Sequence, residues 1–213
     1  LKVKGINPEG ATVAIQGFGK VGYWAALALE KLGLRIVAVS DVQGGVTGFS
    51  KIEKIQNFVK ESGSVVGAPG TEKLTNTELL HLPVDVLVPA ALADAITHES
   101  APGIKAKIVV EGANAPTTPQ GDQILNDKGV LVVPDILANS GGVIVSYFEW
   151  VQDKQNFFWS ADEVRENLTQ ILMRSITEVS EMASSSRVTW REAANMIGVG
   201  RVAQAHRLRG LYP

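Results

Sequence analysis

Short apolar runs, separated by stretches of helical periodicity, dominate the first two thirds of the chain. The runs are rich in β-branched residues and apolar at nearly every position, which is typical of strands covered by helices on both faces. There are five of them, at residues 12–16, 35–40, 84–89, 107–111 and 130–134. Because helical stretches lie between them, the pattern predicts parallel βαβ units with right-handed crossovers.

The stretches between the runs predict amphipathic helices. A helix over residues 50–60 would bury Ile52, Ile55, Phe58 and Val59. Gly33 follows the first helical stretch, where a left-handed C-cap is expected. The apolar face of that first helix recurs at i, i+4, i+7, i+8 and i+11, as Val21, Ala25, Ala28, Leu29 and Leu32.

From about residue 150 onward the pattern is helical only. Capping boxes at residues 75–78 and 160–163 and a Thr-Pro pair at 118–119 mark helix starts. The serine run at 184–186 predicts a break, after which residues 189–192 open another helix. We therefore expect one α/β domain over residues 1–213. It would comprise a doubly wound, mainly parallel Rossmann-like sheet in residues 1–150 and a helical extension in residues 151–213.

The composition narrows the possible partners. The chain has 213 residues, of which 45% are hydrophobic, and a formal net charge of −2. This near-neutral balance gives no electrostatic reason to expect a nucleic-acid partner or an anionic membrane. No apolar run approaches the roughly 20 residues of a membrane span. Cysteine is absent and the three histidines stand far apart in sequence, so we expect neither disulfides nor a metal site, in a soluble, cytoplasmic protein.

A glycine motif lies between the first apolar run and the first predicted helix. GxGxxG alone is a weak signal in a chain with 21 glycines, but a strand before it and a helix after it are what dinucleotide binding requires. The first glycine permits the tight turn, the second lets the backbone approach a pyrophosphate, and the third brings the helix close to the strand. The alternative is a turn that merely needs glycine. The predicted cofactor-binding residues here are Gly17, Phe18, Gly19, Lys20, Val21 and Gly22.

Asp41 directly follows the second run, roughly 20 residues after the motif, where an acid that binds the adenosine ribose is expected. Its carboxylate would accept bonds from the ribose hydroxyls and repel a 2′-phosphate, which favours NAD over NADP. An acid that only caps the loop is the alternative. Lys51 and Lys54 lie close enough in sequence to approach a 2′-phosphate, so NADP is not excluded.

The later runs end in residues suited to the rest of a dinucleotide, since ligands of doubly wound folds bind at the carboxyl ends of the strands. Ala90 and Ala91 are small enough to leave room for a flat ligand, although they are equally common at a helix start. Asn114 and Asn139 carry carboxamides that match the nicotinamide amide or its ribose. Asparagine is also a common turn residue, so both interpretations stay open at this point.

Taken together, these segments resemble the cofactor-binding domain of the glutamate dehydrogenases, within the wider amino-acid dehydrogenase family. The resemblance extends over almost the whole chain in the expected order, and its last segment is the most specific. The matching segments are residues 12–22, 37–45, 88–91, 110–117 and 139–150.

The resemblance implies NAD(P)-linked oxidative deamination of L-glutamate to 2-oxoglutarate and ammonia, in a homo-hexamer. It implies that Asn114 and Asn139 lie near the nicotinamide and that Ser146 contacts the substrate side-chain carboxylate. The catalytic lysine and aspartate of the family belong to a domain that precedes the first strand. The sequence begins at Leu1 rather than Met. We therefore expect a piece of a longer enzyme, with no catalytic residue in this chain, which alone binds cofactor without turnover.

Three alternatives remain at the level of sequence. The chain could belong to a non-catalytic regulatory subunit of the same family. It could belong to a dehydrogenase of branched-chain or aromatic amino acids. A methyltransferase is the third, because glycine-rich loops after a first strand also bind S-adenosylmethionine.

Overall fold

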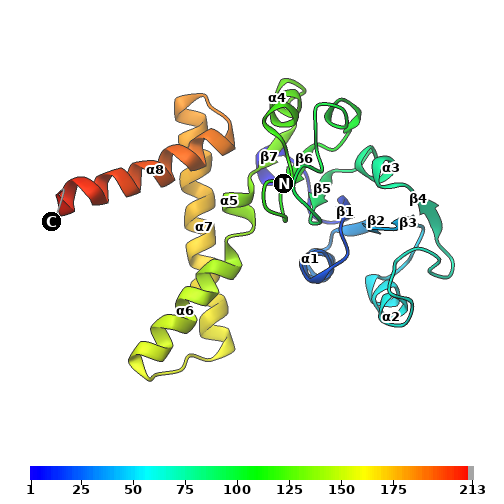
Figure 1. Cartoon of the computed structure of the whole chain (residues 1–213), viewed down its shortest axis with the longest axis horizontal. Helices are drawn as coiled ribbons and strands as arrows, with labels where there is room; N and C mark the ends of the chain where they lie inside the picture. The colour runs from blue at the N-terminus through cyan, green and yellow to red at the C-terminus, as the bar shows by residue number, and fades with distance from the viewer. Residues whose placement is uncertain (211–213) are drawn as a thin grey trace. The chain divides into compact units, whose positions relative to one another are not determined.

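A computed structural model describes residues 1–210 of the chain (Figure 1). The fold divides into two compact units, one over Leu1–Asp135 and one that begins at Ile136. The first unit contains the sheet, and the second is built from long helices. Sequence analysis places the start of the helical extension after residue 150, and the second unit begins at Ile136.

Within residues 1–210, a seven-stranded sheet organises the first unit, in the order β4-β3-β2-β1-β5-β6-β7. The pairs β2–β1, β1–β5, β5–β6 and β6–β7 are parallel. In contrast, β3 runs antiparallel to both of its neighbours, β2 and β4. This is the doubly wound, mainly parallel sheet that the sequence predicts. The strands are β1 Thr12–Gln16, β2 Arg35–Asp41, β3 Gly44–Thr47, β4 Glu72–Leu74, β5 Val86–Pro89, β6 Ile108–Val110 and β7 Leu131–Val133.

Helices cover both faces of the sheet. On one face, Ile15 of β1 packs in a core with Ile52 and Ile55, and on the other Ala14 packs in a core with Leu79 and Leu125. Figure 1 shows the same division, with α1 and α2 on one side and α3 and α4 on the other. The elements are α1 Lys20–Lys31, α2 Ile52–Ser62, α3 Asn76–Leu80 and α4 Pro119–Asp127, with 3₁₀ helices η1 Lys2–Lys4 and η2 Ala101–Gly103.

The strand order reverses at β1, which pairs with β2 on one side and β5 on the other. The chain leaves β1 toward β2 and later returns to β5, so the connections diverge at this point. In doubly wound folds such a reversal opens a crevice beyond the carboxyl ends of the strands. The fold therefore places the end of β1, and the glycine loop after it, at the natural binding site.

The predicted apolar face of α1 is only partly correct. Val21 is 53% exposed and Leu32 67% exposed, whereas Gly22 and Ala26 are the buried residues of the helix. Leu29 of the predicted face packs against the core, as Tyr23 and Leu27 do, but only the small Gly22 and Ala26 are fully buried. Close packing of helix on strand is the reason, because only a short side chain fits at the contact. The predicted inward face of α2 is confirmed, with Ile52 and Ile55 buried and Phe58 and Val59 packed against the core.

Two strands, β3 and β4, were not predicted. Gly44 and Gly45 are poor strand residues, yet here they pair antiparallel with Asp41 and Ser40. A Cβ atom on Gly44 would lie 3.0 Å from the carbonyl oxygen of Leu74, on the neighbouring strand. Glycine therefore permits a close approach of backbones, which a pattern of apolar residues does not reveal.

The second unit contains α6 Gly141–Gln155, α7 Ala161–Ser186 and α8 Trp190–Arg209, and the short α5 Asp135–Ala138 leads into it. The predicted capping box at the start of α7 and the predicted start of α8 are confirmed, and α8 also begins with a capping box. The predicted break between the two helices is present but lies directly after the serine run, because α7 continues to Ser186 and α8 begins at Trp190. The hydroxyl of Ser184 donates to the carbonyl oxygen of Ser180 at 2.9 Å, a bond that serine can make inside a helix. None of the helices within residues 1–210 is both long and apolar enough to cross a membrane.

Candidate functional site

The glycine loop packs between the carboxyl ends of β2 and β5. Gly17 has φ +95°, and a Cβ atom there would lie 2.7 Å from backbone atoms of both Ala90 and Ala91. The N–H of Gly17 donates to the carbonyl oxygen of Ser40 at 2.9 Å, and the N–H of Ala90 donates to that of Gln16 at 2.7 Å. Both the backbone conformation and the lack of space therefore require glycine at position 17.

The first turn of α1 has backbone N–H groups that no helical carbonyl and no capping side chain accepts. Gly19 is the N-cap, with φ −81° and ψ −159°, and no side chain caps this end. The first bond of the helix runs from the N–H of Tyr23 to the carbonyl oxygen of Gly19, at 3.0 Å. The N–H groups of Lys20, Val21 and Gly22 precede it and have no acceptor within the helix. A Cβ atom on Gly19 would meet open space, so an anion has room to approach this positive helix end.

Asp41 lies at the end of β2, next to the glycine loop. Its two carboxylate oxygens accept hydrogen bonds from the backbone N–H groups of Gln43, at 2.8 Å, and Val65, at 2.7 Å. These bonds hold the carboxylate in place and match the loop-capping alternative. Each carboxylate oxygen retains a further acceptor site, so the same group can also accept bonds from ribose hydroxyls.

A cavity of about 610 Å³ joins these groups, which is within the usual range for small-molecule sites. Six of the predicted cofactor-binding residues line it: Gly17, Phe18, Gly19, Asp41, Ala90 and Ala91. Lys20, Val21 and Gly22 belong to the first turn of α1 and are not among its lining residues. The lining within residues 1–210 contains one acid and neither lysine nor arginine. Lys51 and Lys54 are exposed and lie outside it.

Two polar residues that line the cavity, Gln16 and Asn76, escaped the sequence analysis, together with apolar lining residues such as Val42. Gln16 is the last residue of β1, Val42 begins the β2–β3 turn, and Asn76 opens α3. The carboxamide nitrogen of Asn76 donates to the backbone carbonyl of Asp41 at 3.0 Å. Gln16 carried a usable signal, because it is a polar residue that ends an otherwise apolar run. Asn76 carried none, since it lies far from the glycine loop in sequence.

The sequence profile of the Glutamate/Leucine/Phenylalanine/Valine dehydrogenase family matches residues 1–210. The chain belongs to this family. A glutamate dehydrogenase of Thermotoga maritima is 52% identical over 100% of this chain and 52% of its own length. The cryptic catabolic NAD-specific glutamate dehydrogenase GudB of Bacillus subtilis is 44% identical over 98% of this chain and 49% of its own length. The chain thus spans about half the length of these relatives.

Among solved structures, a hetero-hexameric glutamate dehydrogenase of Thermus thermophilus in its Leu-bound form superposes with a TM-score of 0.93. It is 37% identical, over 100% of this chain and 50% of that one. The resemblance drawn from the sequence motifs is therefore confirmed. Membership in a dehydrogenase family also excludes the methyltransferase alternative.

Asn114, which the family resemblance assigns to the nicotinamide, lies exposed in the loop between β6 and α4. Hydrogen bonds tie that loop to the start of α5. The N–H of Ala115 donates to the carboxylate of Asp135 at 2.7 Å, and the N–H of Asp135 donates to the fully buried carboxylate of Glu111 at 2.8 Å. This chain of bonds fixes the position of the loop that carries Asn114.

Asn139 and Ser146 both lie in the second unit. Asn139 is half-buried just after α5, and Ser146 is exposed on α6, one and a half turns into the helix. Their assignments, to the nicotinamide and to the substrate carboxylate, stay predictions.

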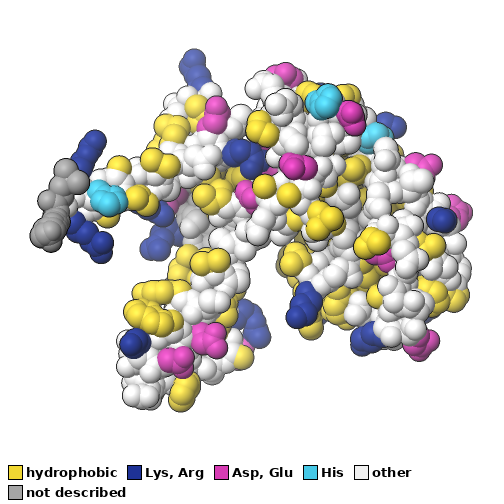
Figure 2. Space-filling model, viewed as in Figure 1, with side chains coloured by type: hydrophobic (Ala, Val, Ile, Leu, Met, Phe, Trp, Pro, Cys, Tyr) yellow, Lys and Arg dark blue, Asp and Glu magenta, His cyan; other side chains and the backbone are white. Residues whose placement is uncertain are grey.

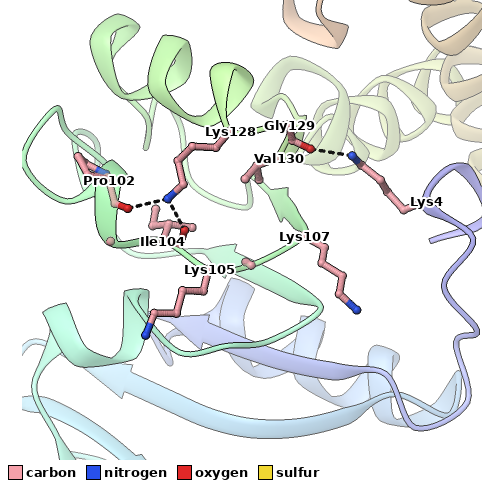
Figure 3. A pocket seen from close by; sticks show the side chains of 10 residues that line it. Lys4, Pro102, Ile104, Lys105, Lys107, Lys128, Gly129 and Val130 are labelled. Atoms are coloured by element: carbon pink, nitrogen blue, oxygen red, sulfur yellow. Dashed lines mark hydrogen bonds between the residues drawn. The ribbon is translucent and has the colours of Figure 1, made fainter.

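A second cavity, of about 530 Å³, lies at the opposite, amino-terminal edge of the strands (Figure 3). Four lysines line it, but most of them have protein partners. Lys128 donates to the carbonyl oxygens of Pro102 and Ile104, at 2.6 Å each, and Lys4 to that of Gly129 at 2.7 Å. The lysines thus cap backbone carbonyls, and the cavity is remote from the carboxyl ends where a dinucleotide binds. Within residues 1–210, no group of three or more histidine, aspartate or glutamate side chains could hold a metal ion.

Proposed function

We propose that this chain is the cofactor-binding half of an NAD-dependent glutamate dehydrogenase, which oxidatively deaminates L-glutamate to 2-oxoglutarate and ammonia. The observation that carries the proposal is the cavity at the carboxyl ends of β1, β2 and β5. It combines an open helix N-terminus with a carboxylate on the neighbouring strand, which are the two features that dinucleotide binding needs. The names of the relatives support the amino-acid substrate.

Successive residues of the cavity wall match successive parts of a dinucleotide. The loop of Gly17 and Gly19, with the first turn of α1, would hold the pyrophosphate, and Asp41 would accept bonds from the adenosine ribose. Ala90 and Ala91 would leave room beside the loop for the cofactor. When bound, a nicotinamide ring supplies the hydride acceptor for the oxidation.

NAD is the expected cofactor, and NADP is the alternative. Asp41 would repel a 2′-phosphate, and the described lining offers no basic side chain to neutralise one. The GudB relative, which is NAD-specific by name, supports the same choice.

The remaining site residues complete the proposal. The carboxamides of Asn114 and Asn139 would bind the nicotinamide end, and the hydroxyl of Ser146 would donate to the side-chain carboxylate of the substrate. The catalytic groups would come from outside this chain. Residues 1–213 alone should therefore bind cofactor without turnover, because hydride transfer needs a substrate held in reacting geometry.

Exposed apolar side chains in the second unit support assembly into a larger complex. On α6, Val143 is 75% exposed, Tyr147 59% and Trp150 56%, and Figure 2 shows apolar side chains at the surface of this helix. Apolar patches of this kind are typical of surfaces that become buried on association. We expect a homo-hexamer of the full-length protein, located in the cytoplasm.

The proposal is tested in two steps. Isothermal titration calorimetry of residues 1–213 with NAD and NADP should give saturable binding, tighter for NAD. The full-length protein should form NADH from NAD in a glutamate-dependent manner, followed by absorbance. Leucine, valine and phenylalanine in place of glutamate test the branched-chain and aromatic alternative. Cofactor binding without activity toward any of these amino acids would contradict the catalytic part of the proposal.

A non-catalytic subunit is a second candidate, favoured by the similarity to a structure described as hetero-hexameric, since a hetero-hexamer holds more than one kind of subunit. Such a subunit would bind nucleotide or an effector and alter the activity of a catalytic partner. The purified full-length protein decides between the two. Activity without any other subunit supports an enzyme, and activity only in a mixture with a paralogue supports a regulatory subunit.

A further inference from the structure

The carboxamide of Gln16 is a polar group without a protein partner in the wall of the cofactor cavity. Its oxygen Oε1 is buried and accepts no hydrogen bond, and its nitrogen donates none within residues 1–210. Gln16 ends β1, directly before Gly17, so the strand and the glycine loop fix its backbone. Buried polar groups in proteins are nearly always hydrogen-bonded, so an unpaired one at a binding site indicates a missing ligand or water.

The other polar side chains of this cavity wall already have partners. Both carboxylate oxygens of Asp41 accept backbone N–H groups, and the nitrogen of Asn76 donates to the carbonyl of Asp41. The remaining lining beyond the glycine loop is largely apolar and includes Val42, Val59, Leu92, Ala93 and Ala95. Asp41 can still accept further bonds from the ribose, so Gln16 is the polar side chain of this wall whose amide has no protein partner.

The position of Gln16 corresponds to the base end of a bound dinucleotide. If the pyrophosphate lies at Gly19 and the ribose at Asp41, the base must lie against the wall that contains Asn76 and Ala95. Gln16 adjoins that wall, because Gln16, Asn76 and Ala95 also line a neighbouring cavity of about 310 Å³. Gln16 thus lies where the cofactor cavity, whose lining beyond the glycine loop is largely apolar, meets a smaller cavity lined mainly by polar residues.

We propose that Gln16 recognises the adenine base of the cofactor. A carboxamide presents an acceptor and a donor side by side, and adenine presents the complementary pair, its 6-amino group beside a ring nitrogen. The 6-amino group would donate to Oε1, and Nε2 would donate to the ring nitrogen. This inference rests on the proposed function, because it assumes that an adenine dinucleotide occupies the cavity.

The test measures the contribution of the adenine 6-amino group in the presence and absence of Gln16. The full-length protein and its Gln16→Met variant are titrated with NAD and with the NAD analogue in which purine, without the amino group, replaces adenine. Loss of one hydrogen bond should weaken binding of the analogue to the unmodified protein by about tenfold. The same change of ligand should alter binding to Gln16→Met by less than about twofold, because the acceptor is already absent.

Gln56→Met is the matched control. Gln56 also has a buried, unpartnered Oε1, but it lies on α2 and does not line the cavity, so its variant should keep the tenfold penalty. The Gln16→Glu variant retains an acceptor oxygen, so it should also bind the analogue about tenfold more weakly than NAD. This variant replaces Gln16→Met if the latter does not fold. Loss of the tenfold difference in Gln16→Glu would overturn the proposal. An equal penalty in the unmodified protein and in Gln16→Met would overturn it too, while leaving NAD binding itself intact. Failure of the unmodified protein to bind NAD would instead contradict the proposed function.

Discussion

The carbonyl oxygen of Gly17 occupies the place where a Cβ atom on Gly22 would lie. The side chain of Ile15 closes the same space from β1, with its Cγ2 atom 3.3 Å from that position. The loop and the first turn of α1 are therefore in backbone contact, and this contact aims the helix N-terminus at the cavity. Backbone cannot move aside as a flexible side chain can, so the contact depends on glycine.

Replacement of Gly22 by alanine should accordingly destabilise the fold. We expect the free energy of unfolding to fall by about 3 kcal/mol, because the new methyl group overlaps a carbonyl oxygen in a packed interior. Urea denaturation followed by circular dichroism measures this change. Gly200→Ala is the control: Gly200 lies inside α8 with no atom within 4 Å of its Cβ position, so alanine there should stabilise by up to about 1 kcal/mol. Equal effects of the two substitutions would contradict the contact.

Replacement of Gly19 by valine should separate binding from folding. Its backbone angles suit any L-residue and its Cβ position faces open space, so the free energy of unfolding should change by no more than about 1 kcal/mol. The valine side chain would nevertheless stand where the pyrophosphate must approach. We expect calorimetry to detect no NAD binding, with the urea transition nearly unchanged. A folded Gly19→Val protein that kept its NAD affinity would refute the cofactor assignment.

The contrast between Gly19 and Gly22 also indicates how far sequence analysis reaches. The motif, its strand and its helix could be predicted, because a β-branched run, the GxGxxG spacing and helical periodicity are patterns that extend over only a few residues. The packing of α1 could be predicted only in part, since Leu29 packs against the core as expected but the fully buried residues of the helix are the small Gly22 and Ala26. Close contact between backbones leaves no periodic pattern of hydrophobic residues in the sequence.

The candidate site shows the same limit. Asp41 could be predicted from its distance to the motif, but Asn76 reaches the cavity only because β3 and β4 fold back beside β2. Those strands escaped prediction because Gly44 and Gly45 weaken the local pattern while permitting the close approach. Residues brought together by such non-local pairing have no common signature along the chain.

Asp41→Ser tests whether this carboxylate binds the ribose or only caps its loop. Serine removes the charge that repels a 2′-phosphate and the acceptors for the ribose hydroxyls. We expect the ratio of NAD to NADP affinity to fall by about tenfold, since hydrogen bonds to a charged group are the stronger kind. Calorimetry with both cofactors measures the ratio.

Stability data complete the Asp41 experiment. The variant also loses the bonds from Gln43 and Val65, so some loss of stability is expected in either case. An unchanged cofactor ratio combined with reduced stability would show that Asp41 only caps the loop. Lys54→Ala is the control for NADP, because Lys54 does not line the cavity and its loss should leave both affinities unchanged.

Asp85 makes the stability of the first unit fall at acidic pH. A hydrogen bond from Lys107, at 2.7 Å, and bonds from the backbone N–H and hydroxyl of Thr12, at 2.9 Å each, lower the pKa of the Asp85 carboxyl to about 2. Its ordinary pKa is 3.8. The unfolded chain therefore binds the proton more readily than the folded one, so the stabilisation is complete above about pH 4 and is lost as the pH falls toward 2.

The Asp85→Asn variant should show this loss directly. At pH 6 its free energy of unfolding should be lower than that of the unmodified protein by no more than about 2 kcal/mol, since Lys107 is largely exposed and solvent screens the pair. The difference should shrink as the pH falls from 4 to 2, because protonation removes the same charge from the unmodified protein. Asp162→Asn, in the exposed ion pair with Arg165, should change stability by less than about 1 kcal/mol throughout. A difference between Asp85→Asn and the unmodified protein that stayed constant from pH 6 to pH 2 would mean that the carboxylate charge is not what links β1 to β5 at this end of the sheet.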